Sequence, residues 1–244
     1  MHISCINGAR EDSGNEYQDR YEPSESNTSI ISEKFRARAT CRRMGVHRVV
    51  AAASSLVWGL VSLVQSPAHV VLVGLDSSGK TTILFRLKYG QYANTSPTVG
   101  FNCEKVRAAG TQWLMWDVGG AERVRPLWRP FTRGTDALIF VVDSSCSGDR
   151  LDEARLEIHR LARQQAQDCA PSSRPRPPIL IMANKQDLPG AHEPQYLVKG
   201  LGLTELPEQQ PWAVAPACAI TGEGLGEAMT LLHDLIIKSR KVKK

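Results

Sequence analysis

The sequence lacks the features that mark a secreted or membrane-spanning protein, or one that binds a metal through cysteine and histidine. Its six cysteines are scattered, with no C-x-x-C pair and no histidine cluster at the spacing of metal ligands. One uncharged run, residues 49–66, is too short for a comfortable membrane-spanning helix. No internal repeat is present, and the net charge of +5 does not by itself indicate nucleic-acid binding. We therefore expect a cytoplasmic protein with reduced thiols and no nucleic-acid partner.

Composition divides the chain into four segments. Residues 1–43 are rich in serine, arginine and acidic residues and lack periodicity, so we predict a disordered extension that is not a mitochondrial transit peptide. Residues 44–66 place apolar side chains on one helical face, which is typical of an amphipathic helix in a membrane interface. A signal-peptide core starting at Met44 and an ordinary packing helix are the alternatives. We expect one domain over residues 67–238 and a basic tail at 239–244.

Short apolar runs alternate with amphipathic helical stretches in the predicted domain. Such runs are typical of strands covered on both faces, as in a parallel sheet with helices on each side. A further strand at 101–107 is followed by Gly110 and the run at 112–117, which predicts an antiparallel hairpin. The proline-rich residues 168–178 predict an exposed connector, and a last helix is expected at 226–238. The apolar runs are 69–74, 112–117, 137–143, 179–184 and 212–219. The fold class is therefore α/β, with a mostly parallel six-stranded sheet.

The most specific motif lies between the first predicted strand and the next helix. Residues 74–81 read G-x-x-x-x-G-K-T, the pattern of a phosphate-binding loop, so we expect a P-loop NTPase fold. Backbone N–H groups and the helix start attract phosphate oxygens, Lys80 can reach the outer phosphates, and Thr81 offers a hydroxyl to Mg²⁺. The nucleotide-binding residues predicted here are Gly74, Asp76, Ser77, Ser78, Gly79, Lys80, Thr81 and Thr82.

Asn184 is the last residue of the apolar run at 179–184, and Lys185 and Asp187 come directly after it. A carboxylate at Asp187 can accept hydrogen bonds from the ring N–H and the amine of guanine, whereas adenine would leave it desolvated and unpaired. Lys185 can lay its aliphatic stem on the base. These residues favour GTP or GDP as the ligand and disfavour a P-loop kinase or ATPase.

Two further segments can sense the third phosphate of a nucleotide. Asp117 begins a D-x-x-G turn, in which the Gly120 N–H can meet a γ-phosphate. Thr98 lies in a loop before the second strand, and its hydroxyl can join Thr81 around Mg²⁺ only while that phosphate is present. We predict Thr81 and Thr98 as metal ligands, with Asp117 close behind them. The predicted catalytic groups are Lys80, Thr98 and Gly120.

These motifs resemble those of the small GTPases of the ADP-ribosylation factor (ARF) and ARF-like family. The segments that carry the resemblance are GLDSSGKTT (74–82), PTVGFN (97–102), WDVGGAERVRPLW (116–128), VVDS (141–144), ANKQDLPGA (183–191) and ACAITGEGL (217–225). The resemblance implies a monomeric switch that binds GTP or GDP with Mg²⁺. Its implied partners are an exchange factor, a GTPase-activating protein and effectors in trafficking or signalling.

The resemblance also implies roles for residues outside the nucleotide motifs. Cys218 and Ala219 would lie against the base. Phe101, Trp116 and Phe131 match an aromatic trio that such proteins present to effectors, with Phe131 where tyrosine is usual. Core packing is the alternative explanation for all three aromatic residues.

Ala121 departs from the family pattern, because it stands where a glutamine orients the attacking water. A methyl group cannot hold or polarise that water, so we expect slow hydrolysis and a long-lived GTP form. An arginine supplied by an activating protein stabilises transition-state charge but still needs a positioned water. A backbone carbonyl or a residue of a partner remains as a substitute for the missing amide. A GTP-binding membrane scaffold with no meaningful turnover is the alternative function.

Membrane attachment in the family uses a myristoylated N-terminal glycine. Gly45 would provide it only if translation starts at Met44 or processing exposes it, and Val49 stands where Ser or Thr is preferred. One acyl chain gives only marginal anchoring, so a second signal is needed. Basic residues at the chain end can supply it by attraction to anionic lipids, and a merely solubilising tail is the alternative. They are Lys238, Arg240, Lys241, Lys243 and Lys244. We expect peripheral association with a membrane surface.

Overall fold

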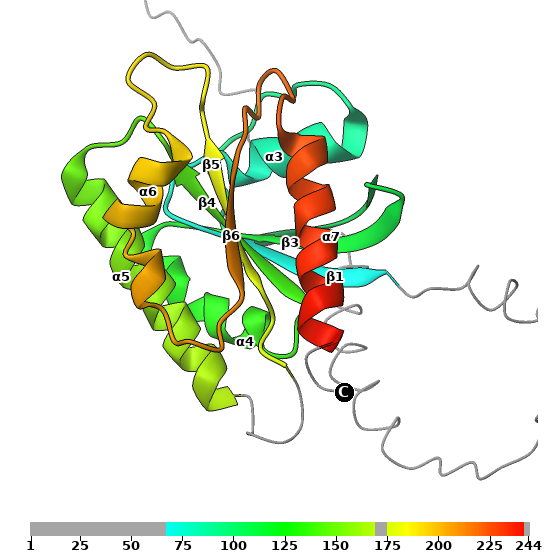
Figure 1. Ribbon diagram of the computed structural model, residues 1–244. Coiled ribbons are helices and arrows are strands. Elements are labelled where there is room, and N and C mark those ends of the chain that lie inside the picture. Colours follow the sequence, from blue (N-terminus) through cyan, green and yellow to red (C-terminus); the bar gives the residue numbers. More distant parts are fainter. Residues whose placement is uncertain (1–66, 169–174, 242–244) are drawn as a thin grey trace, which may run out of the picture. The chain divides into compact units, whose positions relative to one another are not determined.

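The computed structural model describes residues 67–168 and 175–241, whose arrangement is shown in Figure 1. The strands are β1 (Ala68–Val73), β2 (Phe101–Ala108), β3 (Thr111–Val118), β4 (Ala137–Asp143), β5 (Ile179–Asn184) and β6 (Trp212–Pro216). The helices are α3 (Lys80–Tyr89), α4 (Trp128–Thr132), α5 (Gly148–Asp168), α6 (Pro194–Gly200) and α7 (Leu225–Lys241), with 3₁₀ helices η2 (Glu122–Leu127) and η3 (Leu203–Glu205). The predictions for residues 1–43 and 44–66, including Gly45, and for Lys243 and Lys244 fall outside the described residues.

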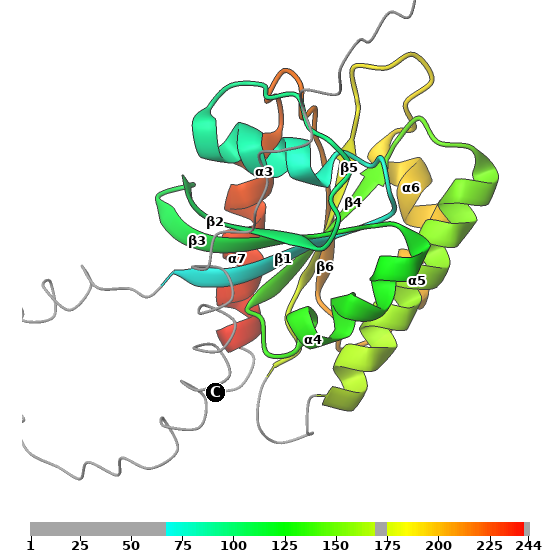
Figure 2. The same ribbon diagram turned by 180° about the vertical axis from the view of Figure 1, so that it is seen from behind.

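The strands form one six-stranded sheet in the order β2-β3-β1-β4-β5-β6. β2 pairs with β3 in the antiparallel sense, and every other pairing is parallel. Helices α3 and α7 cover one face of the sheet, and α4, α5 and α6 lie on the other (Figures 1 and 2). The predicted α/β fold of the P-loop NTPases is therefore confirmed.

The central strands are buried because their side chains are apolar on both faces. Every residue of β5 and all but the last residue of β4 are buried. Burial of each valine, leucine or isoleucine side chain contributes about 1.5–3 kcal/mol. The predicted strands at 137–143 and 179–184 are confirmed residue for residue. β1 begins and ends one residue earlier than predicted, because Gly74 leaves the strand with φ +142°.

The predicted hairpin is confirmed at β2 and β3. Its turn residues, Ala109 and Gly110, have φ values of +50° and +68°. Positive φ at both central residues gives the primed turn that matches the twist of paired strands. Ala108 and Thr111 are the last pair before the turn.

Two predicted boundaries near the end of the chain differ from the structure. β6 ends at Pro216 rather than at residue 219, because the segment after it folds into a turn in which Gly222 N–H donates to Cys218 O at 2.8 Å. α7 continues to Lys241, since Ile236 and Ser239 are buried and extend its packed face. The first three residues of the predicted basic tail are thus helical.

Candidate functional site

The carboxyl ends of the parallel strands meet at the upper end of Figure 1, where the loop 74–79 joins β1 to α3. Gly74 and Gly79 in this loop have φ values of +142° and +92°. A Cβ at Gly74 would collide with Val141 O, and a Cβ at Gly79 would collide with the amide of Asn184. Both positions therefore require glycine, for the backbone conformation and for the close approach of a neighbour. The loop is left open as a cradle of backbone N–H groups.

Lys80 begins α3 and points back into the loop. Its Nζ donates to Leu75 O at 2.7 Å and to Ser78 Oγ at 3.4 Å, and only 6% of the residue is exposed. Burial lowers the pKa of the Lys80 ammonium to about 8, although the charges of Asp117 and Asp76 oppose the shift. A desolvated ammonium gains most from an anion placed beside it, which suits the phosphates of a nucleotide.

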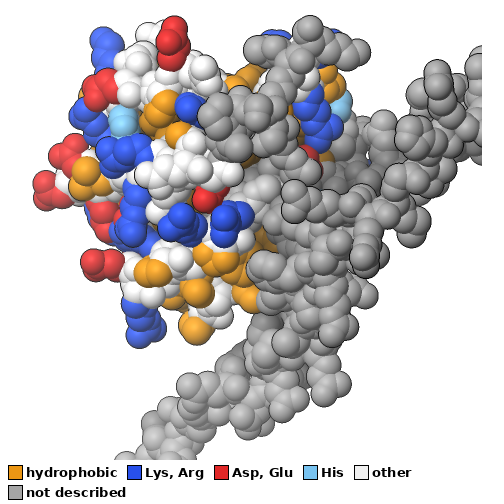
Figure 3. Space-filling view, turned by 90° about the horizontal axis from the view of Figure 1, so that it is seen from below, with side chains coloured by type: hydrophobic (Ala, Val, Ile, Leu, Met, Phe, Trp, Pro, Cys, Tyr) orange, Lys and Arg blue, Asp and Glu red, His pale blue; other side chains and the backbone are white. Residues whose placement is uncertain are grey.

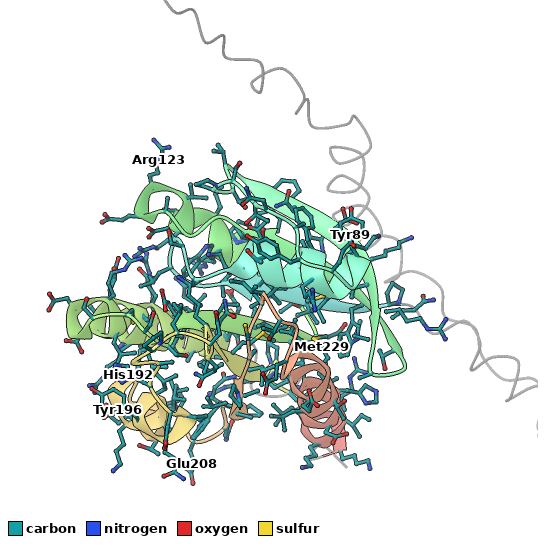
Figure 4. All side chains as sticks on the ribbon, turned by 90° about the horizontal axis from the view of Figure 1, so that it is seen from above. Tyr89, Arg123, His192, Tyr196, Glu208 and Met229 are labelled. Atoms are coloured by element: carbon teal, nitrogen blue, oxygen red, sulfur yellow. The ribbon has the colours of Figure 1, made fainter. Side chains whose placement is uncertain are left out.

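A cavity of about 420 Å³ adjoins the loop. It is lined by Asp76, Ser77, Gly79, Lys80, Thr81, Thr82, Thr95, Ser96, Pro97, Thr98, Gly119, Gly120 and Ala121. Figure 4 shows this end of the molecule from above, with Arg123 of η2 on one side and His192 and Tyr196 on the other. The structure therefore brings the predicted phosphate loop, Thr98 and the D-x-x-G turn together around one space.

The three residues predicted around Mg²⁺ lie in mutual contact. The hydroxyl of Thr81 is 2.7 Å from that of Thr98 and donates to Asp117 Oδ2 at 2.7 Å. Asp117 Oδ2 also accepts from Asn102 Nδ2 at 3.0 Å. Asp117 is fully buried, and its Oδ1 has no hydrogen-bond partner within residues 67–168 and 175–241. Hydroxyl oxygens backed by a buried carboxylate with an unsatisfied oxygen fit a hard divalent cation such as Mg²⁺.

A second cavity, of about 170 Å³, holds the residues predicted to read guanine. Asn184, Lys185, Asp187 and Ala219 line it. Asn184 ties two loops together, since its Nδ2 donates to Ser78 O at 2.8 Å and its Oδ1 accepts from Ala219 N–H at 2.9 Å. Such fixed polar groups at one end of a small cavity suit a planar base with several donors and acceptors.

The side chains of Lys185 and Asp187 are both held by partners. Lys185 Nζ is 2.6 Å from Asp143 Oδ2. Partial burial raises the pKa of the Asp143 carboxyl, but hydrogen bonds from Lys185 and Ser145 outweigh this effect and hold the pKa below its usual value. Cys218 Sγ donates to Asp187 Oδ1 at 3.1 Å. The cysteine predicted to lie against the base therefore contacts the carboxylate predicted to recognise it.

The sequence did not reveal an arginine that fixes the D-x-x-G turn. Arg125 is buried, and its Nε donates to Gly120 O at 3.0 Å. Its guanidinium also pairs with Glu153 at 2.6 Å and Glu157 at 3.4 Å. The only sequence signal was the i, i+4 spacing of these two glutamates, which places them on one face of α5. Trp128 supports the same turn through a hydrogen bond from Nε1 to Gly119 O of 2.9 Å.

The aromatic residues predicted to contact effectors form one cluster. The ring centroids of Phe101, Trp116 and Phe131 are 5.1–5.6 Å apart. Phe101 and Phe131 are partly exposed, whereas Trp116 is only 1% exposed. Core packing therefore describes the Trp116 ring in this arrangement, and its neighbours carry the exposed surface of the cluster.

Comparisons with known proteins agree with this geometry. The sequence model of the ADP-ribosylation factor family matches residues 55–236. The chain belongs to this family. It is 45% identical over 186 residues to human ADP-ribosylation factor-like protein 4C, which covers 74% of this chain and 92% of that protein. It is 44% identical over 179 residues to human ADP-ribosylation factor-like protein 4A, with 71% and 86% covered.

Solved structures give the same result for this ADP-ribosylation factor family member. The Arl6 BBS3 small GTPase of Trypanosoma brucei, with the bound nucleotide analogue GppNp, matches with a TM-score of 0.61 and 34% identity, covering 71% of this chain and 99% of that one. The mammalian SRP receptor shares the fold alone, with a TM-score of 0.59 and 21% identity over 67% of this chain. As a family member the chain is a GTP-binding small GTPase, and GTP hydrolysis and interaction with regulators and effectors are general properties of that family. No helix in the described part of this family member is long and apolar enough to span a bilayer.

Proposed function

We propose that this protein is a guanine-nucleotide switch that holds GTP with Mg²⁺, hydrolyses it slowly and recruits effectors at a membrane surface. One observation carries the proposal. Ala121 lines the phosphate cavity, and the backbone carbonyls of Gly120 and Ala121 already accept hydrogen bonds from the protein. The site therefore has the groups needed to bind a nucleotide but lacks the glutamine amide that would orient an attacking water.

The contacts in the two cavities support the proposed binding roles. The N–H groups of the loop 74–79 and the buried Lys80 ammonium bind the phosphates. Asp187 accepts the donors of guanine, Asn184 holds the surrounding loops together, and Lys185 covers the base. Thr81 and Thr98 would hold Mg²⁺, with Asp117 beside them. When bound, the ion neutralises phosphate charge.

The switch itself is formed by two segments that meet at the phosphate cavity. Gly119 N–H donates to Gly100 O at 2.9 Å, which joins the D-x-x-G turn to the Thr98 loop. A Cβ at Gly119 would lie 2.7 Å from Thr98 O, so the two backbones are in direct contact. Because both segments border the place of the outer phosphate, loss of that phosphate removes a common support. Effector binding then depends on which nucleotide is present.

The surroundings of Ala121 support slow hydrolysis. Its carbonyl accepts hydrogen bonds from Val124 N–H at 2.8 Å and Arg125 N–H at 3.3 Å, where η2 begins. The neighbouring Gly120 carbonyl accepts from Arg125 Nε at 3.0 Å. The Ala121 carbonyl could replace the missing amide only by giving up one of its two bonds, whereas the Gly120 carbonyl is held in its direction by the Arg125 side chain. The scaffold alternative rests on the same observation and differs only in having no turnover at all.

Membrane recruitment is supported by the chemistry of the end of α7. Lys238, Arg240 and Lys241 are exposed there, and Arg240 is paired with Asp136 at 2.8 Å. Lys and Arg side chains gather on the lower face of the molecule, beside apolar ones (Figure 3). Each unpaired basic residue near an anionic bilayer contributes about 1 kcal/mol, so this face is suited to a second, electrostatic contact.

Hydrogen exchange in the two nucleotide states tests the switch. Residues 91–100 and 119–127 should exchange more slowly with Mg²⁺ and a non-hydrolysable GTP analogue than with Mg²⁺ and GDP. Thr98→Ala should abolish this difference, whereas Thr230→Ala, on the exposed side of α7, should retain it. Equal exchange of both segments in the two states of the unmodified protein would rule the switch out.

A further inference from the structure

The loop between β6 and α7, residues 217–224, carries two contacts to the guanine-reading side chains. Ala219 N–H donates to Asn184 Oδ1 at 2.9 Å, and Cys218 Sγ donates to Asp187 Oδ1 at 3.1 Å. A planar base is selected by the positions of its donors and acceptors, so displacement of their partners in the protein affects binding. The placement of this loop therefore governs how Asn184 and Asp187 face the base.

The inner part of the loop is held by the backbone of the sheet. Ala217 N–H donates to Ala183 O at 2.9 Å, at the end of β5. Cys218 N–H donates to Glu223 O at 2.9 Å, which closes the loop on itself. These bonds fix the base of the loop but do not connect its tip to the rest of the molecule.

The tip of the loop is held by an arginine of α3. Arg86 Nη2 donates to Thr221 O. The guanidinium also lies against Gly222, where a Cβ would be 2.6 Å from Arg86 Nε. Gly222 has φ +88°, so the absence of a side chain permits both this backbone conformation and the close approach of Arg86. No carboxylate of the described residues is paired with Arg86, which leaves its guanidinium to this loop.

Arg86 also connects the two halves of the nucleotide site. Helix α3 begins at Lys80, the lysine of the phosphate loop, and the same helix carries Arg86. Within the described residues Asn184 is a second link, since its Nδ2 donates to Ser78 O at 2.8 Å. Because Asn184 is itself hydrogen-bonded to the loop at Ala219, displacement of the loop tip would disturb both links.

We propose that Arg86 is a positioning residue of the guanine subsite: it holds the 217–224 loop against Asn184 and Asp187 and so sets the lifetime and base selectivity of the bound nucleotide. The inference rests on the proposed guanine-binding role of this site. The arginine does not touch the nucleotide and acts through the carbonyl of Thr221.

The test compares Arg86→Gln and Arg86→Lys in the full-length protein with Arg155→Gln as a matched control. Arg155 covers Gly202 in the same manner, where a Cβ would be 2.9 Å from its Nε, and it pairs with Glu205 at 2.8 Å. Neither residue lines the two cavities described above. Loss of Arg155 therefore removes an equivalent surface contact without changing the guanine loop.

Two quantities are measured for each variant: the dissociation rate of fluorescent GDP, and the ratio of the affinities for GDP and IDP, whose base lacks the guanine amine. Arg86→Gln should speed dissociation by about 3- to 10-fold, equivalent to about 0.6–1.4 kcal/mol, and should reduce the GDP to IDP ratio. Arg86→Lys should restore part of both, because an ammonium can still donate to Thr221 O. Arg155→Gln should stay within about twofold of the unmodified protein for both quantities.

An unchanged GDP to IDP ratio in Arg86→Gln would overturn the inference, even if thermal stability fell, because a purely structural arginine would give that result. Asp187→Ala separates this failure from that of the proposed function. If Asp187→Ala abolishes the preference for GDP over ADP while Arg86→Gln changes nothing, guanine recognition stands and the role of Arg86 is wrong. If Asp187→Ala leaves that preference intact, the proposed guanine site itself is wrong.

Discussion

Replacement of Arg125 by methionine is expected to destabilise the protein through its D-x-x-G turn. Methionine fills most of the space of the arginine stem but cannot donate to Gly120 O, which Arg125 Nε contacts at 3.0 Å. The change also leaves Glu157 without its partner at 3.4 Å, and the Glu157 side chain is only 15% exposed. Both losses occur in a largely desolvated environment, where hydrogen bonds and charges matter most.

The magnitude follows from how much of the network survives. Removal of one partner from a fully buried ion pair costs about 3–5 kcal/mol. Here Glu153 still pairs with Arg150 at 2.7 Å, and the Glu153 side chain is 33% exposed. Loss of the bond between Arg125 and Glu153 therefore costs little stability. We expect the free energy of unfolding to fall by about 2–3 kcal/mol, from the buried hydrogen bond and the uncompensated charge of Glu157.

Urea unfolding at a fixed, saturating concentration of GDP and Mg²⁺ measures this change, because bound ligand otherwise shifts the apparent stability. Glu157→Gln in the Arg125→Met background should recover about 1 kcal/mol, since the orphan charge is gone. A loss below about 0.5 kcal/mol, or no recovery in the double variant, would refute this account of the network.

Three further changes address the nucleotide site. Gly120→Ala should weaken binding of a non-hydrolysable GTP analogue at least about tenfold more than binding of GDP. The reason is that a Cβ at this position would lie 2.6 Å from Asp76 N when the turn meets the phosphate loop. Titration with both nucleotides checks this, and equal losses of affinity would contradict it. Since bound phosphate favours the charged form of Lys80, whose pKa is lowered to about 8 by burial, GDP affinity should be constant below that pH and fall by up to about tenfold per unit above it. Calorimetry in two buffers of different ionisation enthalpy near pH 8.5 should then detect proton uptake, and its absence would argue against a buried, titrating lysine. Asp187→Asn should reduce the affinity for GDP by about 10³-fold or more and favour xanthosine diphosphate, whose base presents a carbonyl in place of the amine. Competition binding measures both affinities, and an unchanged affinity for GDP would exclude the role assigned to Asp187.

Much of the fold could be predicted because its central strands are apolar up to their last residue. β4 and β5 are such runs, and helices cover both of their faces. β6 was predicted too long because Ala217 and Cys218 are also apolar and buried, yet they pack in a loop beside the nucleotide cavity. Hydrophobicity alone does not distinguish a buried strand from a buried loop.

The arrangement of the candidate site could be predicted where its residues follow one another in a motif, and not where they meet only in space. The loop 74–81 and the triplet of Asn184, Lys185 and Asp187 are local patterns with fixed spacing. The partnership of Arg125 with the glutamates of α5 joins residues 28 and 32 positions apart. Pairings of this kind depend on the packing of η2 against α5, which no short stretch of sequence encodes.

Ala121 should leave the protein loaded with GTP for longer than a glutamine at this position would. The test is single-turnover hydrolysis of GTP in the presence of Mg²⁺ by the purified protein. Ala121→Gln is measured beside it, with equal loading verified for both proteins. We expect the unmodified protein to stay loaded while Ala121→Gln hydrolyses its GTP at least about tenfold faster. Equal rates in the two proteins would contradict this expectation, because another group would then position the water.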